Sequence, residues 1–452
     1  MRRARFLGEL LWKNNLGIYQ LAELETQLLQ RYAGLFTLPY QSAPRRAYLH
    51  VLSKAYDSGG HTRIAEHLLH SELLQDAGVL VSEKAQTLSL NKLQRAKHGC
   101  VVLPRMRNSR QKIQRLLEHF AQYTTLLLHI HPHDIETVMA AAMAKKFCGT
   151  SVYLYNHADH VFSYGYGVMD KVLEISYFGW DLRAARGTLD KSVYVGIPLK
   201  LAAAEKNQAP RTALPEGHIA TAGTAYKYRP SLGYSFPEFA QQLVATSKKD
   251  LVLIGPRLLL DWWWWRAARQ MGQHAHFHPR MPYQQYLDFM AHASLYVDSF
   301  PMTGGTAFAE VVSQGLPCFG ILTGAHGYSP ADQLKSPSQA ALLQDILAYL
   351  QNPVRPSVDQ AAVIQQVRQV HAVEQVALRI SRAGLMSKEE SAPTWANPAA
   401  IRVDFYEKIS ASAKVFAPTV HCRPDWKLSL LFLRFWIQSR KHSALIKNKI
   451  NL

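Results

Sequence analysis

Small and hydroxylated residues follow one short apolar run of this sequence in a pattern that suits phosphate binding. The run Ala293–Asp298 is typical of a buried strand, and Thr303, Gly304, Gly305 and Thr306 lead from it into an apolar helical segment. Glycines let the backbone approach a diphosphate closely, and the free amides and dipole of a helix start stabilise its negative charge. The threonines could cap that helix. A glycine pair alone also fits an ordinary strand-to-helix turn, but the flanking residues favour a nucleotide-binding loop.

Two further groups of residues could complete a site for a nucleotide diphosphate. Glu310 lies in the helix that follows the glycines, where its carboxylate could accept hydrogen bonds from a ribose. Gly223, Lys227, Tyr228 and Arg229 form a second loop after a predicted strand. A lysine ammonium there could stabilise the charge that develops on a departing diphosphate, although a solvated surface lysine is the plain alternative. We expect Lys227 to be catalytic and the other members of both groups to bind the nucleotide.

Histidines and small polar residues follow three other predicted strands, so they could line the opposite side of the same cleft. His61 stands in a Gly-Gly-His-Thr turn, where an imidazole with a pKa near neutrality could take a proton from a hydroxyl or orient a sugar. A structural histidine that caps the next helix is the alternative. Zinc also binds such clusters, but side chains at strand ends suit hydrogen bonds to sugar hydroxyls better. The expected acceptor or sugar contacts are Gly60, His131, His133, Asn156, His157 and Asp159, with no metal.

Four segments, in this order, resemble the signatures of glycosyltransferases of the GT-B fold, and most closely the catalytic region of O-GlcNAc transferase-like enzymes. Asp57–Arg63 resembles the glycine-histidine loop of that family, and Lys146–Ser151 occupies the place of a Gly-Thr-Ser turn. Gly223–Pro230 resembles its lysine loop, and Asp298–Glu310 its donor-nucleotide loop. The four segments together are far more specific than any one of them.

The resemblance implies a metal-independent hexosyl or N-acetylhexosaminyl transfer from a nucleotide-sugar co-substrate, with a uridine diphosphate sugar favoured, and no other cofactor. The acceptor would be a hydroxyl of a cell-surface glycan or glycolipid. Many retaining GT-B enzymes carry two glutamates eight positions apart; Glu310 matches the second, but Met302 stands at the first, so we expect inversion. Protein O-glycosylation stays open, although no tetratricopeptide array is present. The alternatives are a sugar-nucleotide epimerase or hydrolase of the same fold, and a non-catalytic basic protein that binds membranes or nucleic acid.

Strands alternate with helices along most of the chain, which predicts two Rossmann-like, doubly wound α/β domains that face a cleft. The first clear strand is Ala47–Leu52, and a second alternation begins at Ile219 after a stretch without periodicity. Ligands of open α/β sheets bind at the carboxyl ends of the strands, so the motifs should converge between the domains. We expect an acceptor-side domain over residues 1–205, a nucleotide-binding domain over 217–385 and a basic helical segment over 386–452.

Charge and cysteine content narrow the partners and the compartment. The 51 basic and 33 acidic side chains give a formal net charge of +18, which favours polyanionic partners. The sequence offers no nucleic-acid recognition motif, so an anionic membrane surface is the better candidate. The cysteines are scattered without metal-ligand or redox spacing, which indicates reduced thiols in the cytoplasm. They are Cys100, Cys148, Cys318 and Cys422.

Three apolar stretches bear on membrane contact. The basic start Met1–Trp12 is interrupted by Glu9, so it fails as a signal peptide, and no apolar run is long enough to span a bilayer. Trp426–Lys441 mixes aromatic, leucine and basic residues as an interfacial helix does, but a helix that packs across the first domain fits equally well. The run Trp262–Trp265 favours a bulky core with one exposed ring. We expect a cytoplasmic protein, or a peripheral one on the inner face of the membrane.

Overall fold

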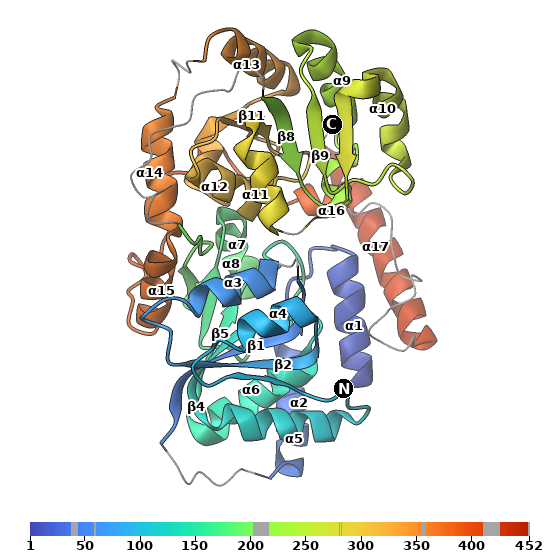
Figure 1. Ribbon diagram of the computed structural model, residues 1–452. Coiled ribbons are helices and arrows are strands. Elements are labelled where there is room, and N and C mark those ends of the chain that lie inside the picture. The colour runs from blue at the N-terminus through green and yellow to red at the C-terminus, as the bar shows by residue number, and fades with distance from the viewer. Residues whose placement is uncertain are drawn as a thin grey trace.

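Two parallel sheets, one in each half of the molecule, organise the computed structural model (Figure 1). The predicted fold, two Rossmann-like α/β domains, is confirmed. Cys422 and most of the stretch without periodicity that precedes Ile219 lie outside the described residues. The structure describes residues 1–37, 44–57, 60–201, 217–279, 281, 283–353, 358–409 and 425–450, with backbone alone for 283, 284 and 439–450.

The first sheet has seven strands in the order β3-β2-β1-β4-β5-β6-β7, and every neighbouring pair is parallel. Its central strands are apolar and buried on both faces, as in a sheet covered by helices on both sides. The strands are β1 Arg46–Ala55, β2 Ala77–Ala85, β3 Cys100–Val102, β4 Tyr123–His129, β5 Ser151–Tyr155, β6 Lys171–Glu174 and β7 Ser192–Tyr194.

Local sequence signals set the ends of the helices around this sheet. Helix α6 is alanine-rich; its first turn is capped by the carboxylate of Asp134, which accepts from the backbone of Thr137 at 3.2 Å, and it ends at Gly149 with a φ of 63°. The helices are α1 Arg2–Lys13, α2 Ala22–Tyr32, α3 Gly60–Leu68, α4 Thr87–Leu93, α5 Ser109–Phe120, α6 Ile135–Cys148, α7 Tyr177–Asp181 and α8 Arg183–Arg186.

The second sheet has the order β10-β9-β8-β11-β12-β13, again with parallel neighbours. Trp264 lies in the core of this half, but Trp262 and Trp265 are both exposed, which corrects the expectation of one exposed ring. The elements are β8 His218–Ala222, α9 Phe236–Ser247, β9 Leu251–Ile254, α10 Trp265–Met271, β10 Ala275–His278, α11 Tyr283–Ala291, β11 Ala293–Val297, α12 Thr306–Ser313, β12 Cys318–Ile321, β13 Lys335–Ser336 and α13 Gln339–Gln351. Short 3-10 helices are η1 Ala33–Leu35, η3 Ala225–Tyr228, η4 Trp262–Trp264, η5 Gly272–His274 and η6 Pro330–Leu334.

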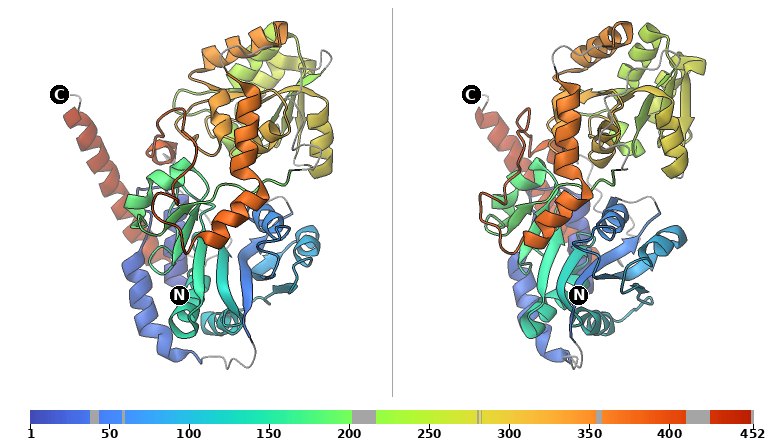
Figure 2. Two further views of the ribbon diagram at one scale, coloured as in Figure 1. Left: turned by 90° about the vertical axis from the view of Figure 1, so that its left-hand side faces the viewer. Right: turned by 60° about the vertical axis from the view of Figure 1, so that its left-hand side comes forward.

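The chain crosses back to the first half through α14, Gln360–His371, and α15, Val373–Arg382 (Figure 2). Arg379 of α15 donates from Nη2 to the carbonyl of Val195 at 2.9 Å. One buried apolar cluster contains residues of both sheets and of these two helices, so the two halves share part of their core. The short helix α16, Phe405–Ile409, packs in a second cluster that also joins both halves.

The last helix, α17, Trp426–Ile450, packs on the first half, which is one of the two arrangements predicted for it; membrane contact stays a prediction. Phe432 is buried against the first half, and Asp425 pairs with Arg3 of α1 at 2.8 Å. On the other face, Leu430 and Leu431 remain exposed, and Figure 2 shows the helix running outwards from the body. None of the helices in the described ranges carries an apolar stretch long enough to cross a bilayer.

Candidate active site

Residues from the two sheets meet where the loops after their strands come together. Nη2 of Arg63 in α3 donates to Oε1 of Glu310 in α12 at 2.5 Å. The hydroxyl of Tyr328, from the second half, donates to Oδ1 of Asp159, from the first, at 3.1 Å. The strand-end motifs of both halves, which are remote in sequence, are therefore neighbours across this junction.

A histidine cluster, His50, His61, His129, His131 and His157, forms the first-domain side of the junction. Nδ1 of His50 lies 3.0 Å from Nε2 of His129, and Nδ1 of His129 lies 2.9 Å from Nε2 of His157. The ring of His61 stacks on His157 with centroids 4.1 Å apart, and His131 meets His61 edge-on. His50 and His129 are buried, whereas His61, His131 and His157 are half-buried. These three are the members that a ligand could reach.

Four members of the histidine cluster, His50, His61, His129 and His157, are held in their neutral form. Burial lowers the pKa of His50 to about 4. Burial, reinforced by His131, lowers the pKa of His61 to about 3, against a hydrogen bond to the backbone of His129. The pKa values of His129 and His157 fall well below 6.5, through burial and then through neighbouring imidazoles. The expectation of a near-neutral pKa for His61 is therefore wrong, because dense packing disfavours the imidazolium.

Three first-domain residues predicted to contact a sugar are buried and engaged elsewhere. Nδ2 of Asn156 donates to Glu174 at 2.7 Å, and its Oδ1 accepts from Tyr166 at 3.1 Å. Asp159 is 1% exposed and accepts from Ser176, Tyr328 and the ring of His160. His133 is fully buried and stacks on Trp12. These three support the loops from within the first half, and direct contact with a sugar stays a prediction for them. Gly60, by contrast, is exposed at the start of α3.

Lys227 lies on the short helix η3 after β8 and reaches the loop after β11. Its Nζ donates to the carbonyl of Thr303 at 2.7 Å, and the side chain is half-buried. The lysine loop and the glycine loop, 76 positions apart, are thus in direct contact. This is the arrangement that a cation beside a bound diphosphate requires.

A lysine–aspartate cluster, Lys227, Asp298, Asp332 and Lys335 around Thr303, forms the second-domain side. Nζ of Lys335 lies 2.8 Å from Asp298 and 2.8 Å from Asp332, with all three side chains nearly inaccessible. Burial alone would lower the pKa of Lys335, but the two carboxylates outweigh it and raise the pKa. The hydroxyl of Thr303 donates to Asp298 at 2.5 Å and accepts from Lys335. The sequence pointed to Lys227 and Thr303 but missed the buried cation Lys335.

The glycine loop differs from the expected phosphate cradle in one respect. The backbone amide of Gly304 donates to Oδ1 of Asp298 at 2.8 Å, so this amide is not free for a phosphate. The N-cap of α12 is Gly305, with a φ of 48°, and no side chain caps this helix, so the threonine caps predicted there are absent. Gly305 and Thr306 remain half-buried at the start of α12. A Cβ on Gly305 would lie 3.6 Å from the ring of Tyr328, but its positive φ alone favours glycine.

Tyr228, which we predicted to bind the nucleotide, lies in the core beneath the lysine loop. It is fully buried, its ring packs on Phe236 and Trp264, and its hydroxyl bonds to Thr221 at 3.0 Å. Gly223 packs under this ring, since a Cβ there would lie 3.2 Å from the Tyr228 hydroxyl. Both residues shape the lysine loop from below.

Arg229 and Glu310 have protein partners. The exposed guanidinium of Arg229 lies 5.7 Å from the ring of Trp263. Glu310 is 6% exposed, and its carboxylate accepts from Arg63, so the ribose contact predicted for it stays a prediction. Arg63 and Tyr328 lie at the junction but are not among the site residues predicted from the sequence. Arg63 belongs to the glycine-histidine motif, but no local signal marks Tyr328.

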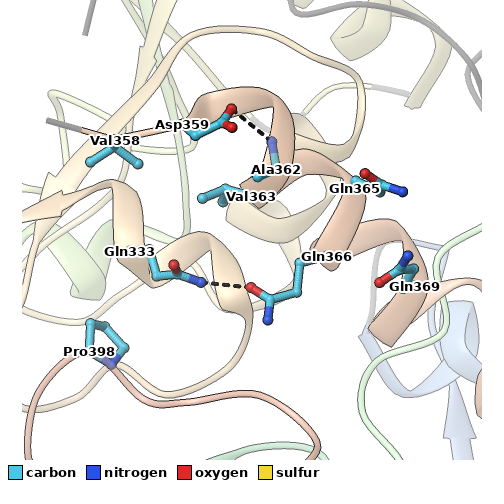
Figure 3. A pocket seen from close by; sticks show the side chains of 9 residues that line it. All are labelled: Gln333, Val358, Asp359, Ala362, Val363, Gln365, Gln366, Gln369 and Pro398. Carbon is cyan, nitrogen blue, oxygen red and sulfur yellow. Dashed lines mark hydrogen bonds between the residues drawn. The ribbon is translucent and has the colours of Figure 1, made fainter. Parts of the chain in front are cut away.

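Two further observations bear on the junction, one on metal ligands and one on a groove beside α14. Among the described residues, no group of three or more histidine, cysteine or acidic side chains could hold a metal ion. A groove of about 640 Å³ opens between η6 and α14, where Gln333 donates to Gln366 at 2.8 Å (Figure 3). None of the residues that line it belongs to the histidine cluster or to the lysine–aspartate cluster.

No protein-family model matches the sequence, and no curated protein matches it. Solved structures share its fold. A lysine-to-methionine mutant of the Thermobaculum terrenum O-GlcNAc transferase aligns with a TM-score of 0.53 and 13% identity, over 86% of this chain and 79% of that one. The lipopolysaccharide outer core galactosyltransferase WaaB aligns with a TM-score of 0.51 and 13% identity, over 74% of this chain and 98% of that one. Anabaena HepE in complex with UDP and glucose aligns with a TM-score of 0.53 and 10% identity, over 75% of this chain and 99% of that one. The chain therefore has the GT-B fold.

Proposed function

We propose that this protein is a glycosyltransferase that moves a sugar from a nucleotide-sugar donor to a hydroxyl of a glycan or glycolipid. The observation that carries the proposal is the contact of Lys227 with the loop at the start of α12, opposite the histidine cluster. A cation and a helix start on one side suit a diphosphate leaving group. Neutral imidazoles on the other side suit uncharged hydroxyls.

In this proposal the acceptor oxygen attacks the anomeric carbon while the bond from that carbon to the diphosphate breaks. Lys227 stabilises the charge that develops on the leaving diphosphate, and the backbone at Gly305 and Thr306 faces its phosphates. A neutral His61 orients the acceptor hydroxyl through a hydrogen bond. With a pKa of about 3 it is a weak base, so the hydroxyl proton passes to the departing diphosphate and does not stay on the imidazole. The lysine takes the place of a metal ion, and Met302 at the position of the first glutamate favours inversion.

The uridine nucleotide and the membrane-bound acceptor are the finer parts of the proposal. The fold is shared with Anabaena HepE, whose structure contains UDP and glucose, which supports a uridine diphosphate donor. The exposed Leu430 and Leu431 of α17, with exposed Lys427 and Arg434 beside them, support a peripheral contact with an anionic membrane that carries a lipid-linked acceptor.

A donor screen that measures release of the nucleotide diphosphate tests the proposal. Release from a uridine diphosphate sugar is expected only when membrane glycolipid extract is present, because transfer needs the acceptor. Release without extract would indicate a hydrolase. Isomerised donor without release would indicate an epimerase, and no donor binding at all would leave a non-catalytic protein.

Lys227→Met separates chemistry from binding at the proposed site. Because the ammonium acts mainly on the leaving group, kcat should fall by about 10²-fold or more, with far less change in donor affinity. Lys248→Met, at an exposed position after α9, is the control and should leave both unchanged. If the loss of affinity accounts for the whole loss of rate, Lys227 is a donor anchor only.

A further inference from the structure

A protruding apolar turn before α10 is not used by the proposed site. Leu259 is 92% exposed, Leu260 and Trp262 are each 62% exposed, and Trp265 is 59% exposed. Large apolar side chains gathered on one surface mark a contact with a partner. We infer that this leucine–tryptophan turn, residues 257–265, is a surface that inserts into an anionic phospholipid bilayer.

The turn is held in a fixed shape before any partner arrives. The backbone amide of Arg257 donates to Oδ2 of Asp261 at 2.7 Å, and the amide of Asp261 donates back to the carbonyl of Arg257 at 2.9 Å. Nε1 of Trp265 donates to the carbonyl of Leu258 at 2.5 Å. Trp264 anchors the turn in the core of the second half. Contact therefore requires little ordering of the chain.

Charge identifies the partner as an anionic surface. The exposed charged side chains of residues 256–270 are Arg257, Arg266 and Arg269. Asp261, the acid in that range, is 7% exposed, and its carboxylate is taken up by the turn itself. Exposed leucines and indoles with exposed arginines on both sides in the sequence are the residue types that contact the acyl chains and the anionic headgroups of a membrane interface.

The position of the turn ties this contact to the proposed site. Trp263 of the turn lies under the guanidinium of Arg229, two positions from Lys227. Figure 1 shows α10 and α17 on the same side of the molecule, in different halves. The inference rests on the proposed function in one respect only: it names the bilayer as the source of the lipid-linked acceptor.

Flotation of the full chain with vesicles tests this surface. The vesicles are phosphatidylcholine with and without phosphatidylglycerol, and the variant is Leu259→Ser with Leu260→Ser. Binding to the anionic vesicles should fall roughly tenfold or more, because two side chains lose their apolar partner. Leu385→Ser is the matched control, since Leu385 is 89% exposed elsewhere, and it should bind as the unmodified chain does. Arg266→Gln with Arg269→Gln should reduce the preference for anionic vesicles.

Each other outcome overturns the inference. Unchanged vesicle binding by the leucine variant excludes the turn, and loss of binding only in Leu430→Ser with Leu431→Ser assigns the contact to α17 alone. If the leucine variant instead abolishes self-association in sedimentation, the turn is an interface between copies of the chain. Donor binding, measured without vesicles, should be the same in all these variants, so failure here is distinct from failure of the proposed function.

The histidine cluster carries a second, independent inference. In a hydrogen-bonded row of neutral imidazoles each bond uses one N–H, so the row from His50 through His129 to His157 has one direction. Nε2 of His50 is buried and has no partner among the described residues. An orphaned acceptor is tolerated better than an orphaned N–H. We infer that His50 donates into the row and acts as a positioning residue that fixes the Nδ1–H tautomer of His157.

Nitrogen NMR of histidine-labelled protein tests this direction without any substrate. His157 should show a protonated Nδ1 and an unprotonated Nε2, with His157→Asn used to assign its signals. His50→Phe should release His157 to a mixture of tautomers, and His50→Asn, which can still donate, should keep the single form. A protonated Nε2 in the unmodified chain, or no change in His50→Phe, would overturn the inference.

Discussion

The two sides of the junction bury polar groups in opposite ways. The histidine cluster disfavours charge, since burial lowers the pKa values of His50, His61, His129 and His157 until these four stay neutral. The lysine–aspartate cluster keeps charge, since Lys335 lies between two carboxylates in an almost inaccessible position. Neutral rings can hydrogen-bond uncharged hydroxyls, whereas a charged frame can hold a cation such as Lys227 against an anion. We therefore propose that the acceptor binds on the histidine side and the donor diphosphate on the lysine–aspartate side.

The largest effect on stability should come from removing the buried cation of the lysine–aspartate cluster. Lys335→Met leaves Asp298 and Asp332 buried without their cation, which should lower the free energy of unfolding by roughly 3–5 kcal/mol. Denaturant unfolding measures it, with Lys248→Met as the control that should change stability by less than about 0.5 kcal/mol. A loss below about 1 kcal/mol would show that this side does not depend on buried charge.

Acid should lower the stability of the histidine cluster, by less for each histidine than the loss expected for Lys335→Met. The pKa of His50 is about 4 in the folded protein, below the ordinary 6.5, so the unfolded chain binds the proton first. The stability that His50 contributes is present above pH 6.5 and is lost as the pH falls towards 4. At about 1.36 kcal/mol per pH unit, this histidine should cost about 2 kcal/mol between pH 6.5 and 5.

Denaturant unfolding of the His50→Asn variant across this pH range measures the pH-dependent stability that His50 contributes. Its stability should fall less steeply with acid than that of the unmodified chain. His70→Gln, which changes an exposed histidine after α3, is the matched control at the surface. If His50→Asn has the slope of the unmodified chain, the histidine cluster takes up protons readily, and the contrast between the two sides disappears.

The sequence was sufficient for the sheets and for the loops that follow their long strands. Each of β1, β4 and β11 contains an apolar stretch that precedes small or polar residues, and this pattern is local. Strands of two to four residues, such as β6 and β13, carry too few residues to show a period. The Trp residues before α10 split between core and surface because a 3-10 helix, with three residues per turn, precedes the α-helix.

Side-chain pairing was the part that the sequence could not supply. Lys335 meets Asp298 across 37 positions, and no periodicity links them. Helix α1 was missed for a related reason. Glu9 and Lys13 interrupt its apolar run, but they pair at 2.8 Å along one helical face. Tyr228 reads as a ligand contact from its motif and is buried because Phe236 and Trp264 close over it. Burial and long-range charge pairs are decided by packing, which a motif does not encode.

The smallest expected effect concerns the seam where the two sides meet, the pair of Arg63 and Glu310. With their side chains 29% and 8% exposed, solvent screens the pair in part, so Arg63→Gln and Glu310→Gln should each cost about 1 kcal/mol of stability. The double variant should cost little more than either, because both changes remove one interaction. Additive losses would mean that the two side chains act separately.

Calorimetry with uridine diphosphate on the same variants measures how the pair of Arg63 and Glu310 affects nucleotide affinity. If the pair serves only to hold the lysine–aspartate side against the histidine side, Arg63→Gln and Glu310→Gln should weaken nucleotide binding equally. Equal losses would mean that the Glu310 carboxylate stays engaged by Arg63, as it is in the structure, when the nucleotide binds. A loss of roughly 1.5–3 kcal/mol confined to Glu310→Gln would instead give the carboxylate a charge-assisted hydrogen bond to the ribose. Glu310 would then belong to the donor site, and Arg63 would merely orient it.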